Sequence, residues 1–212
     1  AVCTCSSCRT PANGGAGSIS NGNYYLYGGA GMIYLKANSQ NYGDVLIKNN
    51  NALGALTDMV DGSYQFGKID VKDKAQLNVS SGDTIYSTNL NIQNGGIVTN
   101  TGTLNIPKDF KLDSNGVMNQ NAGVFYNGDL VIGSAGTFNL NTKLTLPSLI
   151  VRQNGVLSHN QGVTASELVV TGNVTVENGG KIDVSGKGYG SASGSGAGGS
   201  ASGIGNGAGA GY

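Results

Sequence analysis

Residues 89–100 read NLNIQNGGIVTN, and this stretch shows a pattern that repeats through the chain. Leu90 and Ile92 form an apolar pair at positions i and i+2, and a third apolar residue, Ile97, follows five positions later. Gly95 stands two positions before Ile97. Alternation with a period of two is typical of strands that bury one face. The stretch therefore predicts two short strands joined at a corner that contains glycine.

The same unit recurs along the middle of the chain, with its apolar pairs 19 to 21 residues apart. The pairs are Ile69/Val71, Leu90/Ile92, Phe110/Leu112, Leu130/Ile132 and Leu149/Val151; the third apolar residues are Leu77, Ile97, Met118, Phe138 and Leu157; the small residues are Ala75, Gly95, Gly116, Gly136 and Gly155. A late unit repeats the pattern with Val174/Val176, Gly180 and Ile182. Short strands at this spacing predict an all-β fold, a parallel β-solenoid whose coils stack about 4.8 Å apart. The alternative is an antiparallel β-sandwich with Asn-Gly hairpins.

Each coil of such a solenoid needs a corner, and the small residue is expected to supply it. Glycine adopts a positive φ without the steric cost of a Cβ atom. Asparagine precedes the small residue at Asn94, Asn115 and Asn154, and asparagine tolerates the left-handed region better than most residues. We expect the small residue to take the positive φ and the stacked asparagines to form a hydrogen-bonded ladder.

If the coils stack in register, the first residues of successive pairs share one interior column. The column is predicted to hold Leu90, Phe110, Leu130 and Leu149, and Phe138 is predicted to be buried. The stacked coils are expected to span residues 65–185, between an irregular N-terminal cap at 23–64 and a Gly/Ala/Ser-rich tail at 186–212.

The cap region contains three further signals. The segments GMIYLK and DVLIKN predict opening strands. The segment NALGALTDMV, residues 51–60, spaces Leu53, Leu56 and Val60 like one short amphipathic helix. Half of the ten tyrosines also fall here: Tyr24, Tyr25, Tyr27, Tyr34 and Tyr42. They predict either a cap over the first coil or a contact surface for a neighbouring subunit or a sugar.

All three cysteines lie in an N-terminal arm, residues 1–22, at Cys3, Cys5 and Cys8. An odd number means that one intrachain disulfide would leave a thiol for another subunit in an oxidising compartment. Haem attachment is excluded because Arg9, not histidine, follows Cys8. A metal site would need a fourth ligand, and the only histidine is His159. We expect disulfide chemistry, with metal binding or inert thiols as alternatives.

Composition narrows the classes of partner. Charged residues make up 11% of the chain and the formal net charge is zero, so the basic surface of a nucleic-acid-binding protein is not expected. No apolar run is long enough to span a bilayer. The chain begins Ala-Val-Cys without methionine, which is typical of a processed, exported protein. We therefore expect a secreted or cell-surface protein without a cofactor.

The coil of about 20 residues, with its NGGIV and NGVL corners, resembles the repeats of filamentous-haemagglutinin-type secreted bacterial proteins. GGKIDVSGKGYG, residues 179–190, also resembles segments of large bacterial surface solenoid proteins. Together the likeness covers roughly residues 65–190. The resemblance implies a right-handed β-helix, export and a surface role, often in adhesion.

Catalysis is not expected, although one column of acids could suggest it. Asp109 and Asp129 each precede an apolar pair, so they are predicted to lie on adjacent coils. That spacing is near the carboxylate separation of a retaining glycosidase. Lys108 and Lys111 flank Asp109, however, and a solvated charge cluster or a weak cation site explains the pair as well.

Two functions remain open from the sequence. The first is a non-enzymatic structural subunit of an extracellular filament or biofilm matrix, a homopolymer that assembles through solenoid ends and terminal arms. In that hypothesis neighbouring subunits clamp the tail, with Ile204 and Tyr212 as anchors, and Tyr24, Tyr25 and Tyr27 contribute to assembly. The second is an adhesin-type module that binds carbohydrate or a cell surface.

Overall fold

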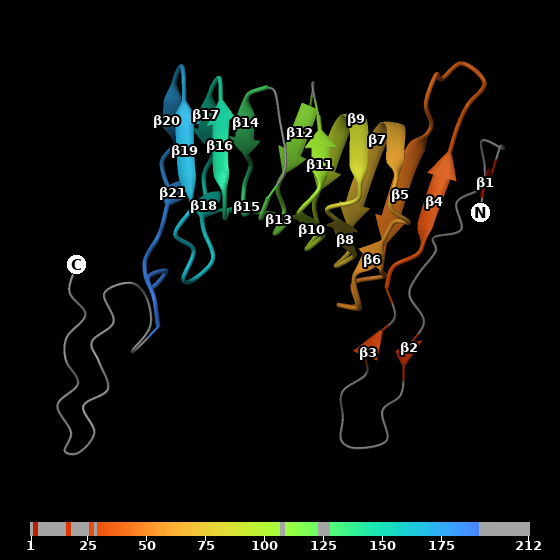
Figure 1. The fold of residues 1–212 in the computed structure, drawn as a ribbon, viewed down its shortest axis with the longest axis horizontal. Helices are drawn as coiled ribbons and strands as arrows, with labels where there is room; N and C mark the ends of the chain where they lie inside the picture. The colour runs from red at the N-terminus through yellow and green to blue at the C-terminus, as the bar shows by residue number, and fades with distance from the viewer. Residues whose placement is uncertain are drawn as a thin grey trace.

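The computed structural model describes residues 29–106, 109–122 and 128–190, together with the backbone of three two-residue strands nearer the N-terminus. Every regular element in these residues is a β-strand. The strands stack side by side as about six coils of about 21 residues along the long axis of the molecule (Figure 1). The predicted parallel β-solenoid is confirmed, and the antiparallel sandwich is excluded.

Two long sheets run along the stack. The first sheet contains, in spatial order, β1 (Val2–Cys3), β4 (Met32–Leu35), β5 (Asp44–Lys48), β7 (Ser63–Lys72), β9 (Thr84–Ile92), β12 (Asp109–Leu112), β14 (Leu130–Ile132), β17 (Leu149–Val151) and β20 (Val174–Val176), with β11 (Thr103–Asn105) beside β9. The second sheet contains β6 (Thr57–Asp58), β8 (Gln76–Val79), β10 (Ile97–Asn100), β13 (Val117–Gln120), β15 (Thr137–Leu140), β18 (Val156–Ser158) and β21 (Lys181–Ile182).

Two smaller sheets complete the described strands. β16 (Lys143–Leu146) pairs in parallel with β19 (Glu167–Val170). β2 (Ala16–Gly17) pairs antiparallel with β3 (Leu26–Tyr27).

The predicted interior column is present. Phe110 pairs with Leu90, and Leu130 pairs with Leu149. All four side chains are buried, as is Phe138 on the second sheet. Continuous parallel pairing brings equivalent apolar residues of successive coils into one core, which explains why so regular a repeat is needed along the sequence.

One predicted register is wrong by one residue. In the coil of residues 89–100, Val98 and not Ile97 pairs with Leu77 on one side and Met118 on the other. Val98 is fully buried, whereas Ile97 is only partly buried. The two consecutive glycines at this corner left the choice open, and Gly96 is therefore the equivalent of Gly116.

Among the predicted small residues, Gly95 takes the expected positive φ of 73°, whereas the glycines at the other corners have a different role. At Asn115-Gly116 and Asn154-Gly155 the asparagine takes the positive φ, 63° and 59° respectively. A Cβ atom added to Gly116 would lie 2.3 Å from the carbonyl oxygen of Ile92 on the preceding coil. A small residue is required there because the backbones of two coils approach closely.

In the described residues, asparagine ladders occur on the strands of the second sheet and directly after them, and not at the Asn-Gly corners. Asn139 donates to Asn119 over 2.8 Å, and Asn141 donates to Asn121 over 2.7 Å. The corner residue Asn94 instead bonds to the carboxylate of Asp73 on the coil before. The predicted helix over residues 51–60 is also wrong, because that segment contains β6 and leaves Leu53 and Val60 exposed.

The N-terminal end of the first sheet carries a cap. β4 runs antiparallel to β5 and parallel to β1, so these two N-terminal strands run against the direction of the coils that follow. Tyr34 of β4 contacts Phe66 with ring centroids 6.2 Å apart, and its hydroxyl accepts a hydrogen bond from the Gly43 backbone. Tyr34 packs against the core, as expected for a cap, whereas Tyr42 is 48% exposed.

Candidate functional site

The last coil of the solenoid exposes side chains that belong to the interior columns. Val174 pairs with Leu149, Val176 with Val151, and Ile182 with Leu157. The three residues of the preceding coil are at most 5% exposed, whereas Val174, Val176 and Ile182 are 44–54% exposed. Val184 continues the exposed row. We call the surface formed by Val174, Val176, Ile182 and Val184 the open end.

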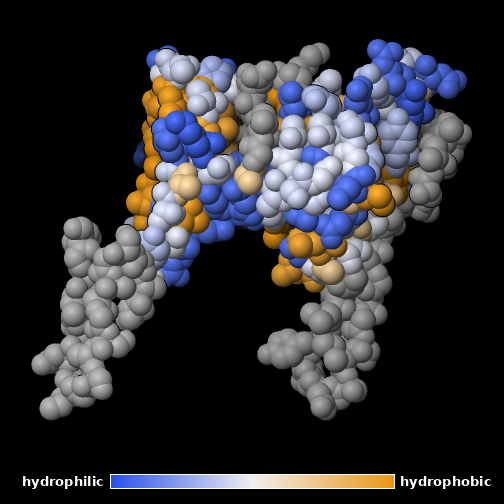
Figure 2. Space-filling model, viewed as in Figure 1, coloured by the Kyte–Doolittle hydropathy of each residue, from blue (hydrophilic) through white to orange (hydrophobic). Residues whose placement is uncertain are grey.

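Figure 2 shows this apolar surface at the end of the stack that carries β20 and β21. The exposure follows from the position of this coil at the end of the stack. Each coil covers the inward side chains of the coil before it, and no described residue stacks on the coil that contains β20 and β21. Removing a valine or isoleucine side chain from water contributes about 1.5–3 kcal/mol. Covering the open end with another chain segment would therefore lower the free energy of the folded protein.

Strand edges lie beside the apolar row. β20 is the last strand of the first sheet, and β21 is the last strand of the second. β19 is the second strand of its two-stranded sheet, paired on one side with β16. An edge strand presents N–H and C=O groups that can pair with another chain. The open end thus combines apolar area with backbone groups ready for strand addition.

The N-terminal end differs from the open end. The Thr57 hydroxyl of β6 donates to the carbonyl of Ala30 over 2.7 Å, and Ala30 is 4% exposed. A Cβ atom added to Gly29 would lie 2.8 Å from the carbonyl oxygen of Leu56. Residues 29 and 30 therefore lie directly against β6, and β4 extends the first sheet beyond β5. Described residues of the chain therefore cover the N-terminal end of the solenoid, whereas none of the residues that the structure describes covers the open end.

Charged side chains of both signs border the open end. Lys181 and Asp183 flank the inward Ile182, and Lys187 follows on the chain. The backbone N–H of Ser185 donates to Asp183 over 2.9 Å. This hydrogen bond lowers the pKa of Asp183, and the charges of Lys181 and Lys187 act in the same direction. Asp183 is therefore a carboxylate at neutral pH, directly after β21 and two residues from Lys181.

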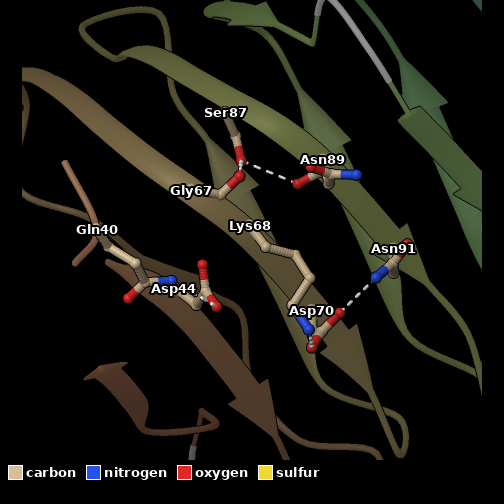
Figure 3. Close-up of polar contacts among 8 residues, drawn as sticks. All are labelled: Gln40, Asp44, Gly67, Lys68, Asp70, Ser87, Asn89 and Asn91. Atoms are coloured by element: carbon tan, nitrogen blue, oxygen red, sulfur yellow. Dashed lines mark hydrogen bonds and ion pairs between the residues drawn. The ribbon is translucent and has the colours of Figure 1, made fainter. Parts of the chain in front are cut away.

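The outer face near the N-terminal end is polar and internally paired (Figure 3). Lys68 Nζ lies 2.9 Å from Asp70 Oδ2, and Asn91 donates to Asp70 Oδ1 over 2.6 Å. The Ser87 hydroxyl donates to the carbonyl of Asn89 over 2.9 Å. Because Asp70 is already bonded to a lysine and an amide, this cluster fits a stabilising ladder between coils better than a site for acid–base chemistry.

The column of acids suggested by the sequence is aligned in part. Asp109 pairs with Asn89. Leu112 pairs with Ile132, so the same register places Asp129 beside Asp109 on the next coil. Asp129 is exposed, while the side chain of Asp109 lies outside the described residues. The separation of the two carboxylates stays a prediction.

Most residues proposed for assembly lie outside the described part of the chain. Cys5, Cys8, Tyr24, Tyr25, Ile204 and Tyr212 belong to this group. For Cys3 and Tyr27 only the backbone is described, in β1 opposite Leu35 and in β3 opposite Ala16. The sequence predicted assembly through the solenoid ends, but it treated the late unit as one more coil and did not identify the inward residues that this coil exposes.

Comparisons with known proteins give no relative: no family, no curated protein and no solved structure matches this chain. Within residues 29–106, 109–122 and 128–190 no three metal-ligating side chains gather into a group. No helix that could cross a membrane occurs in the same part of the chain.

Proposed function

We propose that this protein is a non-enzymatic structural subunit of an extracellular filament or cell-surface matrix, and that it joins other copies through the open end. The observation that carries the proposal is the exposure of Val174, Val176 and Ile182 in columns that are buried one coil earlier. Exposed apolar area of this kind beside unpaired strand edges is typical of an interaction site.

Two features support the proposal. The repeat resembles that of filamentous-haemagglutinin-type secreted proteins, which implies export and a surface role. The described outer surface carries asparagine ladders and paired charges, such as Lys68 with Asp70, so its polar groups are used to hold coils together. A long, stiff stack with one open end suits a building block better than a catalyst.

The test is the state of assembly of the full chain. Sedimentation velocity over a range of concentrations, with electron microscopy of the same samples, should show species larger than the 21.4 kDa monomer. Val176→Asp should weaken assembly at least about tenfold, because a carboxylate would have to be buried in the contact. Val60→Asp is the matched control, since Val60 is 84% exposed and belongs to none of the columns that reach the open end.

The result that would overturn the proposal is a monomer at every concentration, or assembly that Val176→Asp and Val60→Asp affect equally. Far-ultraviolet circular dichroism of both variants should show that the β-fold is retained. This control separates loss of assembly from loss of structure.

A further inference from the structure

β21 directs unpaired backbone groups out of the open end. The N–H of Lys181 donates to Gly155 over 3.0 Å, and the N–H of Asp183 donates to Leu157 over 2.9 Å. Both partners lie on or beside β18, on one side of β21. Because successive residues of a strand direct their backbone groups to opposite sides, the N–H and C=O of Ile182 face the open edge.

Head-to-tail stacking of a second copy is disfavoured by charge and by the cap. Thr57 of β6 belongs to the same column as Leu77, the column that ends at Ile182. A copy that continued the second sheet in register would therefore place Asp58 beside Asp183. Two carboxylates directly opposite each other on neighbouring strands repel. In addition, residues 29 and 30 already lie against β6, where the second copy would have to pair.

If two open ends pair with each other, residues of opposite charge face each other across the contact. If β21 pairs antiparallel with β21 of a second copy about a two-fold axis at Ile182, the two Ile182 residues exchange both backbone hydrogen bonds. Lys181 then lies opposite Asp183 of the second copy, and Asp183 lies opposite its Lys181. The axis repeats this opposite-charge pair on both sides, and the exposed apolar rows of the two copies face each other.

We infer that the open end is an isologous interface, at which two copies join tail to tail through antiparallel β21 strands. The inference rests on the proposed assembly function and specifies its partner and its geometry. A closed two-fold contact buries both copies of the same patch, so no second open surface is required. It also accounts for the absence, among residues 128–190, of a segment that covers the open end.

Charge reversal at Asp183 distinguishes tail-to-tail pairing from head-to-tail stacking, because it should weaken assembly in the first geometry and strengthen it in the second. In the tail-to-tail dimer, Asp183→Lys places lysine opposite lysine and should weaken dimerisation about tenfold, since two pairs change at once. In head-to-tail stacking the same variant would face Asp58 and strengthen assembly. Lys181→Glu should also weaken the dimer, and the double variant Lys181→Glu/Asp183→Lys should restore it.

The measurement is the concentration dependence of molar mass for the full chain, by sedimentation equilibrium. Lys111→Glu, an exposed charge reversal on a central coil, is the control and should leave the dimer unchanged. Assembly that Asp183→Lys strengthens, or that the double variant does not restore, would overturn the inference while leaving assembly through the open end intact. A monomer at all concentrations would overturn both, and would leave another segment of the same chain as the cover of the open end.

Discussion

Phe110 and Phe138 meet edge to face inside the solenoid, with ring centroids 6.3 Å apart and ring planes at 87°. Phe110 belongs to β12 of the first sheet and Phe138 to β15 of the second, so the contact joins the two sheets across the core. Edge-to-face pairs contribute about 0.5–1.5 kcal/mol beyond the area that they bury. This contact lies in the central coils, and Phe138 is two coils before Ile182 of the open end.

Phe138→Ala should lower the free energy of unfolding by about 3–5 kcal/mol, because Phe138 is fully buried and its removal leaves a cavity. Urea unfolding followed by circular dichroism measures the change. Val60→Ala serves as the control, since Val60 is largely exposed and its truncation should have little effect. Equal effects of the two variants would show that Phe138 is not a core residue.

Gly116→Ala should destabilise the solenoid by about 1–3 kcal/mol, the range found for overpacked cores. The added methyl group would lie 2.3 Å from the Ile92 carbonyl oxygen, so neighbouring coils must move apart. Gly188→Ala is the matched control because nothing lies within 4 Å of its added Cβ atom. Thermal unfolding of both variants tests the point, and an unchanged melting temperature for Gly116→Ala would contradict it.

Two buried amides interrupt an otherwise apolar column. Asn100 donates to Gln120 over 3.0 Å inside the core, between Val79 and Leu140 on the flanking coils. Gln120→Leu should cost about 1–3 kcal/mol because it leaves the Asn100 amide without this acceptor. The double variant Asn100→Leu/Gln120→Leu should recover most of that loss. A double-mutant cycle by urea unfolding measures the coupling, and additive losses would show that the pair is not coupled.

The ion pair of Lys68 predicts a small dependence of stability on alkaline pH. The hydrogen bond to Asp70 raises the pKa of Lys68 above its ordinary 10.5, and the charges of Asp70 and Asp44 add to this against the effect of burial. A raised pKa means that the stabilisation is present below the unfolded pKa and is lost as pH rises through the folded pKa. The Lys68 side chain is 42% exposed, so screening should keep the effect under about 1 kcal/mol.

Lys68→Gln should accordingly flatten the decline of unfolding free energy above about pH 10. Urea unfolding at a series of pH values compares the slopes of the variant and the natural protein. Asp70→Asn should flatten the curve in the same way, because it removes the other half of the pair. Parallel curves for all three proteins would show that the ion pair contributes nothing measurable.

The repeating part of the fold could be predicted from the sequence because burial and strand pairing use the same residues. Most inward residues, such as Leu90, are apolar at successive coils, so the period and the columns are visible without a structure. The exact register at the Asn94-Gly95-Gly96 corner could not be predicted, since both glycines are small. Only the approach of Gly96 to the Val71 carbonyl oxygen, where an added Cβ atom would lie at 2.3 Å, identifies the equivalent position.

The exposure of the last coil and the extended backbone of residues 51–60 could not be predicted, because neither depends on local pattern. Val174 and Val176 have the same spacing as buried pairs, and their exposure results from the absence of a described coil beyond them. Leu53, Leu56 and Val60 matched a helical spacing, yet pairing of β6 with β8 imposed an extended backbone there. In both places tertiary neighbours, and not the intrinsic preference of the segment, determine the outcome.

The three cysteines indicate how tail-to-tail dimers would extend into a filament. A two-fold contact at the open end closes on itself, so longer assembly needs a second contact elsewhere, and the arm with Cys3, Cys5 and Cys8 is at the other end of the sequence. We expect these thiols to be oxidised in native material, with at least one bond between subunits, because their number is odd. Mass spectrometry of unreduced, alkylated protein should find fewer than three free thiols per chain, and non-reducing electrophoresis should show a covalent dimer. Replacing all three by serine should stop assembly at the dimer and leave the open-end contact unchanged. Three free thiols, or filaments that form equally well without the cysteines, would contradict the prediction.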